Sequence, residues 1–163
     1  MSNVTLYMAM SVDGYITGEN GDVSWVGDAS WQSYQKFVST CDVVIVGRRT
    51  FIMMEKDEFA NSAKYYIATH DKNADTGVYP SRAIRNRDDL PSVKTIGVIG
   101  GGDLNGSLAT RGLIDEIILD IEPVILGSGI RLFGSHHPSL TLELITSRTI
   151  GTNTVQHHYH VLR

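Results

Sequence analysis

An apolar run that ends in three consecutive glycines is the feature of this sequence that most constrains its fold. Residues 94–99 predict a short buried strand, and the glycines at 100–102 follow it directly. Without a Cβ atom, glycine lets the backbone turn sharply, and Asp103 can cap a helix over residues 104–111. The free N–H groups and the positive end of such a helix point at the turn. We therefore interpret the run as an anion site, in preference to a tight turn without a ligand.

A second predicted strand, residues 42–47, also ends in glycine and is followed by Arg48, Arg49 and Thr50. This strand is apolar along both faces, which is typical of a parallel strand covered on both sides. Arginine pairs with phosphate through two hydrogen bonds and keeps its charge. Because cations are unfavourable at a helix N-terminus, a bound anion explains these residues better than two solvated arginines do.

The remaining segments complete an α/β pattern. A helix is expected at 28–40, and strands are expected at 3–10, 15–17, 64–70, 78–80, 114–123, 140–149 and 154–162. This order predicts a three-layer α/β sandwich, in which helices flank a mostly parallel central sheet and a C-terminal antiparallel hairpin closes it. We expect a single domain over residues 1–163. Ligands bind such sheets at the carboxyl ends of the strands, where both glycine turns would lie, and two helix N-termini there suit a diphosphate.

Composition and charge exclude several classes of protein. No apolar run approaches the roughly 20 residues that span a bilayer, and the N-terminus has neither a basic region nor a signal-type apolar stretch. Cys41 is the only cysteine, which fits a reducing cytosol. The formal net charge is −4 and no basic run stands out, which argues against a nucleic-acid partner. A local basic pocket for one small anion remains compatible with this net charge.

Two tryptophans and an aspartate are candidates for a substrate site. Residues 18–25 form a polar, glycine-rich loop that can close over a ligand through Trp25, or can be an ordinary surface loop with its tryptophan in the core. In the following predicted helix, Trp31 belongs to an apolar face at helical spacing. Asp28 opens that helix and is either its N-cap or a carboxylate buried against a substrate.

The histidines near the C-terminus raise the question of a metal. On a strand, His158 and His160 share a face and could bind a metal together. The sequence shows no acidic or cysteine partner near them, so we expect no metal site.

Four segments in this order resemble the dihydrofolate-reductase-like fold family. They are Ser-Val-Asp-Gly-Tyr-Ile (11–16), Val-Gly-Arg-Arg-Thr-Phe (46–51), Val-Ile-Gly-Gly-Gly (98–102) and the stretch from Asp-Glu-Ile to Leu-Gly-Ser-Gly (115–129). The first and the last are most similar to the reductase domain of the bifunctional riboflavin-biosynthesis deaminase–reductase and its stand-alone relatives. Together the four segments span most of the chain.

This resemblance implies NADPH as the cofactor and a role for each matching residue. The 47–50 motif would hold the cofactor phosphates, including the adenosine 2′-phosphate, the three glycines would carry the pyrophosphate, and the 12–14 segment would lie over the nicotinamide. The implied catalytic residues are Asp28 and Asp13, and the implied substrate-binding residues are Trp25 and Trp31. The implied cofactor-binding residues are Val12, Gly14, Gly47, Arg48, Arg49, Thr50, Thr69, Gly100, Gly101, Gly102, Asp103 and Leu104.

The resemblance further implies the reaction. Hydride would pass from NADPH to a C=N or related bond of a pyrimidine or pterin, and a carboxylate with a raised pKa could protonate the nitrogen. A riboflavin-pathway-type reductase comes first, because the first and last segments favour it, and dihydrofolate is the alternative substrate. A protein that binds a nucleotide or pterin without turnover is the alternative from another class. A cytoplasmic homodimer is expected.

Overall fold

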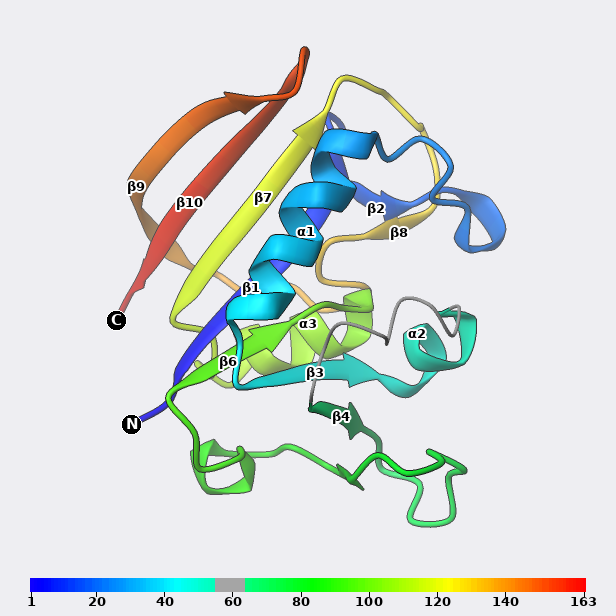
Figure 1. Ribbon diagram of the computed structural model, residues 1–163, viewed down its shortest axis with the longest axis vertical. Helices are drawn as coiled ribbons and strands as arrows, with labels where there is room; N and C mark the ends of the chain where they lie inside the picture. The colour runs from blue at the N-terminus through cyan, green and yellow to red at the C-terminus, as the bar shows by residue number, and fades with distance from the viewer. Residues whose placement is uncertain (55–63) are drawn as a thin grey trace.

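The computed structural model describes residues 1–54 and 64–163, which are built around a sheet of eight strands (Figure 1). Across the sheet the order is β5 (Ser81–Arg82), β4 (Tyr65–Ala68), β3 (Val43–Gly47), β6 (Thr95–Val98), β1 (Asn3–Ser11), β7 (Glu116–Glu122), β10 (Thr154–Leu162) and β9 (Thr141–Ile150). From β5 to β7 neighbouring strands run parallel, whereas β10 pairs antiparallel with both β7 and β9. The expected parallel sheet with a C-terminal hairpin is confirmed.

Three helices accompany the sheet in the described part of the chain. They are α1 (Asp28–Thr40), α2 (Arg48–Met53) and α3 (Gly102–Thr110), and α1 lies in front of the sheet in Figure 1. Single 3₁₀ turns occur at Glu19–Gly21 and Arg87–Asp89, and β2 (Tyr15–Thr17) pairs with β8 (Ile130–Arg131) in a separate ribbon. Among the described helices, none has both the length and the apolar character needed to cross a membrane.

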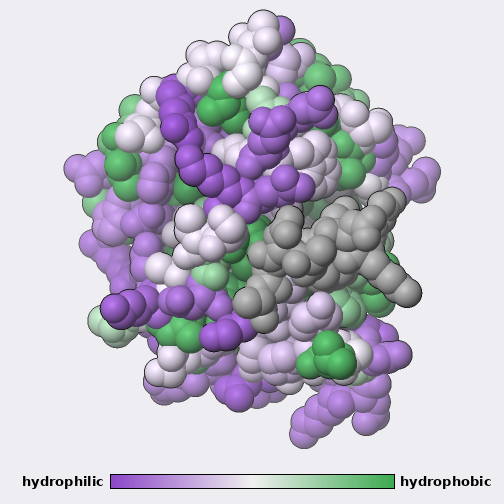
Figure 2. All heavy atoms as spheres, in the orientation of Figure 1, coloured by the Kyte–Doolittle hydropathy of each residue, from purple (hydrophilic) through white to green (hydrophobic). Residues whose placement is uncertain are grey.

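Apolar side chains form two clusters, one for each layer of helices. Leu108 of α3 packs with Val4, Leu6 and Ile117, whereas Val38 of α1 packs with Val44 on the other cluster. Alternate residues of a strand face opposite sides of a sheet, so β3 contributes Val43 and Ile45 to the first cluster and Val44 and Val46 to the second. Hydrophilic residues cover much of the face seen in Figure 2, and apolar ones appear there in separate groups. The expected three-layer arrangement is therefore observed.

Glycine at position 97 lets α1 approach the sheet closely. A Cβ atom there would lie 2.9 Å from the Cys41 sulfur and 3.0 Å from the Phe37 ring. Burial in this packing raises the pKa of the Cys41 thiol to about 11. Cys41 is therefore a small packing residue under the C-terminal end of α1 and not a reactive thiol.

Three element boundaries differ from expectation, each for a local reason. The strand expected at 78–80 lies at Ser81–Arg82, because Pro80 has no N–H to donate and instead accepts a hydrogen bond from the Ile67 backbone. Helix α3 begins two residues earlier than expected, with Gly101 as its N-cap, so Asp103 lies in the first turn and does not cap it. Likewise Gly27, not Asp28, is the N-cap of α1.

Candidate active site

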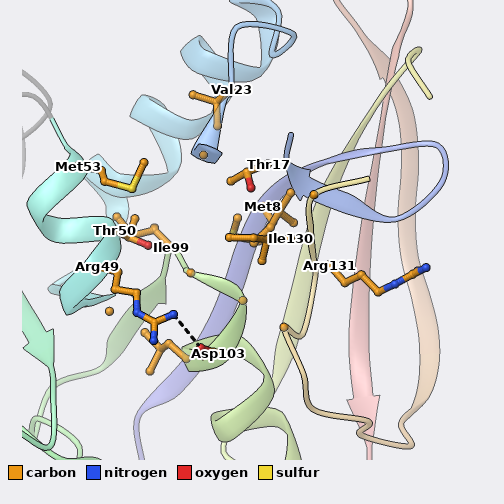
Figure 3. Close-up of a pocket in the computed structure, with 18 of the residues that line it drawn as sticks. Met8, Thr17, Val23, Arg49, Thr50, Met53, Ile99, Asp103, Ile130 and Arg131 are labelled. Atoms are coloured by element: carbon orange, nitrogen blue, oxygen red, sulfur yellow. Dashed lines mark hydrogen bonds and ion pairs between the residues drawn. The ribbon is translucent and has the colours of Figure 1, made fainter. Parts of the chain in front are cut away.

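A cleft of about 1200 Å³ opens at the carboxyl ends of the central strands (Figure 3). Residues from β1, β2 and α1 line one part of it, and residues from α2, the end of β4 and the start of α3 line the other. The segment 127–135, which includes β8, contributes to the wall as well. The cleft thus lies where the sequence predicted a ligand site.

The glycine turn after β6 is shaped by close backbone approaches. Gly100 has a φ of +97° and its carbonyl accepts a hydrogen bond from the Gly47 N–H at 2.8 Å, so the two glycine turns touch. A Cβ atom on Gly102 would lie 2.7 Å from the Arg131 carbonyl oxygen, and one on Gly101 would lie 2.9 Å from the Thr50 hydroxyl. Glycine is therefore required here for the fit of α3 against α2 and β8. The first turn of α3 has no side-chain cap, and its N-terminal residues line the cleft.

Two arginines stand beside this turn. Arg48 pairs with Asp71 at 3.0 Å, and Arg49 pairs with Asp103 at 3.4 Å, the pair marked by a dashed line in Figure 3. Both pairs are solvent-exposed, and pairs of this kind contribute little to stability. Both guanidinium groups can therefore turn toward an anion in the cleft at small cost.

The other cofactor residues predicted from the sequence divide into two groups. Thr69 and Leu104 line the same part of the cleft as the arginines. Val12, Gly14 and Gly100 do not line it, and neither does Asp13, which was predicted as a catalytic residue. Asp13 instead accepts hydrogen bonds from the Ser11 hydroxyl and from the backbone of Leu126 and Gly127.

These hydrogen bonds make Asp13 a structural carboxylate. Partial burial alone would raise its pKa, but the hydrogen bonds from Ser11 and from the 126–127 backbone outweigh it and hold the pKa of Asp13 below its usual value. Asp13 thus ties the β1–β2 turn to the 126–127 loop and lies outside the residues that line the cleft, and its catalytic role stays a prediction.

The wall formed by α1 and β1 is aromatic. Trp31 meets Tyr34 edge-on, with ring centroids 5.8 Å apart, and both side chains line the cleft with Ser30, Tyr7 and Met8. Such a wall can stack against a flat ring. Trp31 therefore lies in the cleft lining, and its role in binding a substrate stays a prediction.

The other two candidates near α1 lie elsewhere. Trp25 does not line the cleft, and its indole N–H donates to the Asp22 carbonyl oxygen at 3.0 Å. Asp28 is exposed and also lies outside the cleft lining. The expectation that Asp28 is buried against a substrate is wrong, because the first turn of α1 directs Ser30 and not Asp28 toward the sheet.

Two buried carboxylates on β7 were not predicted from the sequence. Asp120 is 0% exposed and Glu122 is 3% exposed. Asp120 accepts hydrogen bonds from the Tyr7 hydroxyl and the Gln156 amide, and burial raises the pKa of Asp120. The alternation of acidic and aliphatic residues along 116–122 was visible in the sequence. That alternation predicts that the acidic residues face solvent, whereas helix α1 covers the face that carries Asp120 and Glu122.

His158 has an acidic partner that the sequence did not suggest. One of its ring nitrogens lies 2.7 Å from Glu116 on the neighbouring strand β7. Within residues 1–54 and 64–163, no three metal-ligating side chains converge. His158 is thus one half of a polar pair across two strands.

The sheet order and the position of the cleft define a riboflavin-reductase-like α/β fold. A putative riboflavin biosynthesis protein from Shewanella sp. PV-4 has the same fold, with a TM-score of 0.79, 23% identity and full coverage of both chains. A diaminohydroxyphosphoribosylaminopyrimidine deaminase/5-amino-6-(5-phosphoribosylamino)uracil reductase from Thermotoga maritima aligns with a TM-score of 0.78 and 14% identity, over 99% of this chain and 57% of that one.

The chain belongs to the RibD C-terminal domain family, whose model matches residues 2–84 and 89–156. Two Bacillus subtilis (strain 168) proteins resemble it over nearly their whole lengths. YwjB is 31% identical over 169 residues, covering 94% of this chain and 95% of its own, and YyaP is 27% identical over 180 residues, covering 96% and 94%. Both relatives carry the description "uncharacterized protein". The family is a reductase family, and the resemblance to the riboflavin-biosynthesis reductase domain is confirmed.

Proposed function

We propose that this protein is an NADPH-dependent reductase of the riboflavin-biosynthesis type, which transfers hydride to a small pyrimidine- or pterin-class substrate in the cytoplasm. One observation carries the proposal. Arg48, Arg49 and the uncapped start of α3 meet at one part of the cleft, while an aromatic wall forms another part. Phosphates and a flat ring are the two chemical features that such a cleft accommodates.

The residues present fit a phosphate-rich cofactor. Gly101 and Gly102 line the cleft, and a Cβ atom on either would press against Thr50 or the backbone of residues 131–134, so this position of the α3 start requires glycine. The α3 start would hold the pyrophosphate, and Arg48 or Arg49 would hold the 2′-phosphate. When bound, NADPH supplies the hydride. The chain itself orients the two reactants, and the aromatic wall excludes water from the place where they meet.

One observation favours a substrate without phosphate, such as dihydrofolate, as a second candidate. The described cleft residues of β1, β2 and α1 are all uncharged, whereas the arginines gather at α2. Arg131 lies at the cleft through β8, but its guanidinium extends away from the other labelled side chains and stacks over the Tyr15 ring at 4.9 Å (Figure 3). A phosphate placed against α1 would lack a cationic partner among these residues, which is unfavourable.

Calorimetric titration with NADPH and then NADH tests the proposal. We expect tight binding of NADPH and a clear preference over NADH. The absorbance of NADPH is then followed with dihydrofolate and with the phosphoribosylamino-pyrimidine as oxidants, which separates the two substrate candidates. If neither cofactor binds, the reductase proposal is wrong. If NADPH binds but no substrate of either class oxidises it, a binding protein without turnover becomes the better interpretation.

Substitution of Asp28 with asparagine is expected to leave the reductase rate nearly unchanged. Asp28 is exposed outside the cleft, and substitutions of exposed residues without special contacts usually change free energies by less than about 0.5 kcal/mol, which is about twofold in rate. Steady-state kcat/KM with the best substrate is the measurement. A loss of more than tenfold, with NADPH affinity retained, would restore Asp28 as the acid.

The edge strand β9 supports the proposal of a homodimer. All of its residues except Ile150 are exposed, including Leu142, Leu144 and Ile145. An exposed apolar edge strand presents free backbone N–H and C=O groups to a second copy. We expect the parent protein to show the mass of a dimer by light scattering and Leu144→Asp to shift it toward the monomer. Thr149→Asp, on the same strand, is the matched control, and a monomeric parent would contradict the proposal.

A further inference from the structure

No side chain of helix α1 or of its N-cap residue caps the start of this helix. Its N-cap is Gly27, which offers no side-chain hydrogen bond. The backbone N–H of Gly27 instead donates to the Glu122 carboxylate at 3.1 Å, across 95 positions in the sequence. A carboxylate at this end of a helix is also favoured by the helix dipole. Glu122 on β7 therefore acts as the cap of α1.

The same carboxylate accepts two further hydrogen bonds, one from α1 and one from the neighbouring strand β10. The Ser30 hydroxyl donates to Glu122 at 2.5 Å, and the Thr154 hydroxyl of β10 donates to its other oxygen at 2.9 Å. Gly27 in turn accepts the first hydrogen bond of the helix from the Trp31 backbone at 3.2 Å. The chain of contacts thus runs from Glu122 through Gly27 to Trp31, which lines the cleft.

Asp120 holds the next turn of α1 less directly. The Gln156 amide nitrogen lies 2.8 Å from both Asp120 and the Ser33 hydroxyl, so Gln156 joins that turn to the sheet. Hydrogen bonds are directional, whereas apolar contacts allow sliding. A helix anchored by these side chains is therefore held in one position relative to β7 and β10.

We propose that Glu122 is a positioning residue, which holds the first turn of α1 and so places Trp31 in the wall that receives the substrate. Removing its carboxylate leaves the Gly27 N–H and the hydroxyls of Ser30 and Thr154 without their partner at a buried position, which is costly. The first turn of α1 then shifts to find other partners. The placement of Trp31 follows from the contacts themselves, whereas its effect on substrate binding rests on the proposed function.

The test uses Glu122→Ala and Glu122→Gln in a Trp25→Phe background, where Trp31 is the remaining tryptophan. We expect Glu122→Ala to make Trp31 fluorescence more easily quenched by acrylamide and to shift its emission to longer wavelength. Glu122→Gln keeps an oxygen acceptor for Gly27 and Ser30, and should restore the parent signal. Glu116→Ala is the matched control, because Glu116 lies on the same face of β7 but pairs with His158. We expect its fluorescence to equal that of the parent.

Binding measurements then separate positioning from a loss of the fold. NADPH affinity should stay within about twofold in Glu122→Ala. The value of kcat/KM should fall by about 10- to 100-fold, because the aromatic wall is misplaced. Dihydrofolate is the substrate used for this measurement if the parent protein reduces it. Unchanged Trp31 quenching in folded Glu122→Ala, or an equal change in Glu116→Ala, would overturn the inference. If Glu122→Ala does not fold, Ser30→Ala removes one of the three donors and should give an intermediate rise in quenching; no rise would overturn the inference. A parent that binds no NADPH would refute the proposed function and leave the fluorescence test intact.

Discussion

Replacing Arg48 with alanine is expected to weaken NADPH binding by about 10- to 100-fold and to change NADH binding by less than about twofold. A hydrogen-bonded pair with a charged group contributes about 1.5–3 kcal/mol, which corresponds to this range of affinity. NADH lacks the 2′-phosphate that Arg48 would contact. The exposed partner of Arg48, Asp71, offers little competition, so the guanidinium is available to the ligand. Calorimetry with both cofactors measures the difference directly.

The controls for this prediction come from the same protein. Arg111→Ala removes an exposed arginine beyond the cleft, at the C-terminal end of α3, and should leave both affinities as in the parent. Arg49→Ala shows which of the two arginines faces the 2′-phosphate. An equal loss for NADPH and NADH would assign Arg48 to the pyrophosphate, and no loss for either would remove it from the site.

Substitution of Gly102 with alanine is expected to impair both folding stability and cofactor binding. The new Cβ atom would lie 2.7 Å from the Arg131 carbonyl oxygen and 2.8 Å from the Gly134 nitrogen. Because these are backbone atoms, they cannot rotate away, and the start of α3 must separate from the 131–134 segment. Overpacking of this kind costs about 1–3 kcal/mol of unfolding free energy. NADPH affinity should fall by about tenfold or more, since about 1.4 kcal/mol of lost contact suffices.

A second glycine provides the comparison. Gly18 has an ordinary φ of −74°, and a Cβ atom there would have its nearest neighbours at 3.6 Å. Gly18→Ala should therefore match the parent in urea unfolding and in NADPH titration. If Gly102→Ala also matches the parent in both measurements, the close approach of α3 to the 131–134 segment does not shape the site.

The local sequence was sufficient for much of the architecture. The helix at Asp28–Thr40, the hairpin of β9 and β10 and the two glycine turns all lie where the residues indicated. Periodicity and glycine act within a few residues of themselves, so short stretches carry this information. The apposition of the two turns also followed, because parallel strands bring their carboxyl ends to one edge of the sheet.

Tertiary structure decided which residues face the cleft. One of the two interpretations of Asp28 from the sequence placed it against the substrate, yet Asp28 is exposed, while Asp120 and Glu122 are buried under α1. Alternation along a strand reveals which residues share a face, but it does not reveal whether a helix covers that face. The cap that Glu122 provides for Gly27 joins residues 95 positions apart, and no local pattern specifies such a contact. The sequence by itself therefore determined the helices and strands and their order. The environment of the carboxylates was decided by the packing of α1 against β7 and β10, because burial and hydrogen-bond partners arise only when distant elements meet.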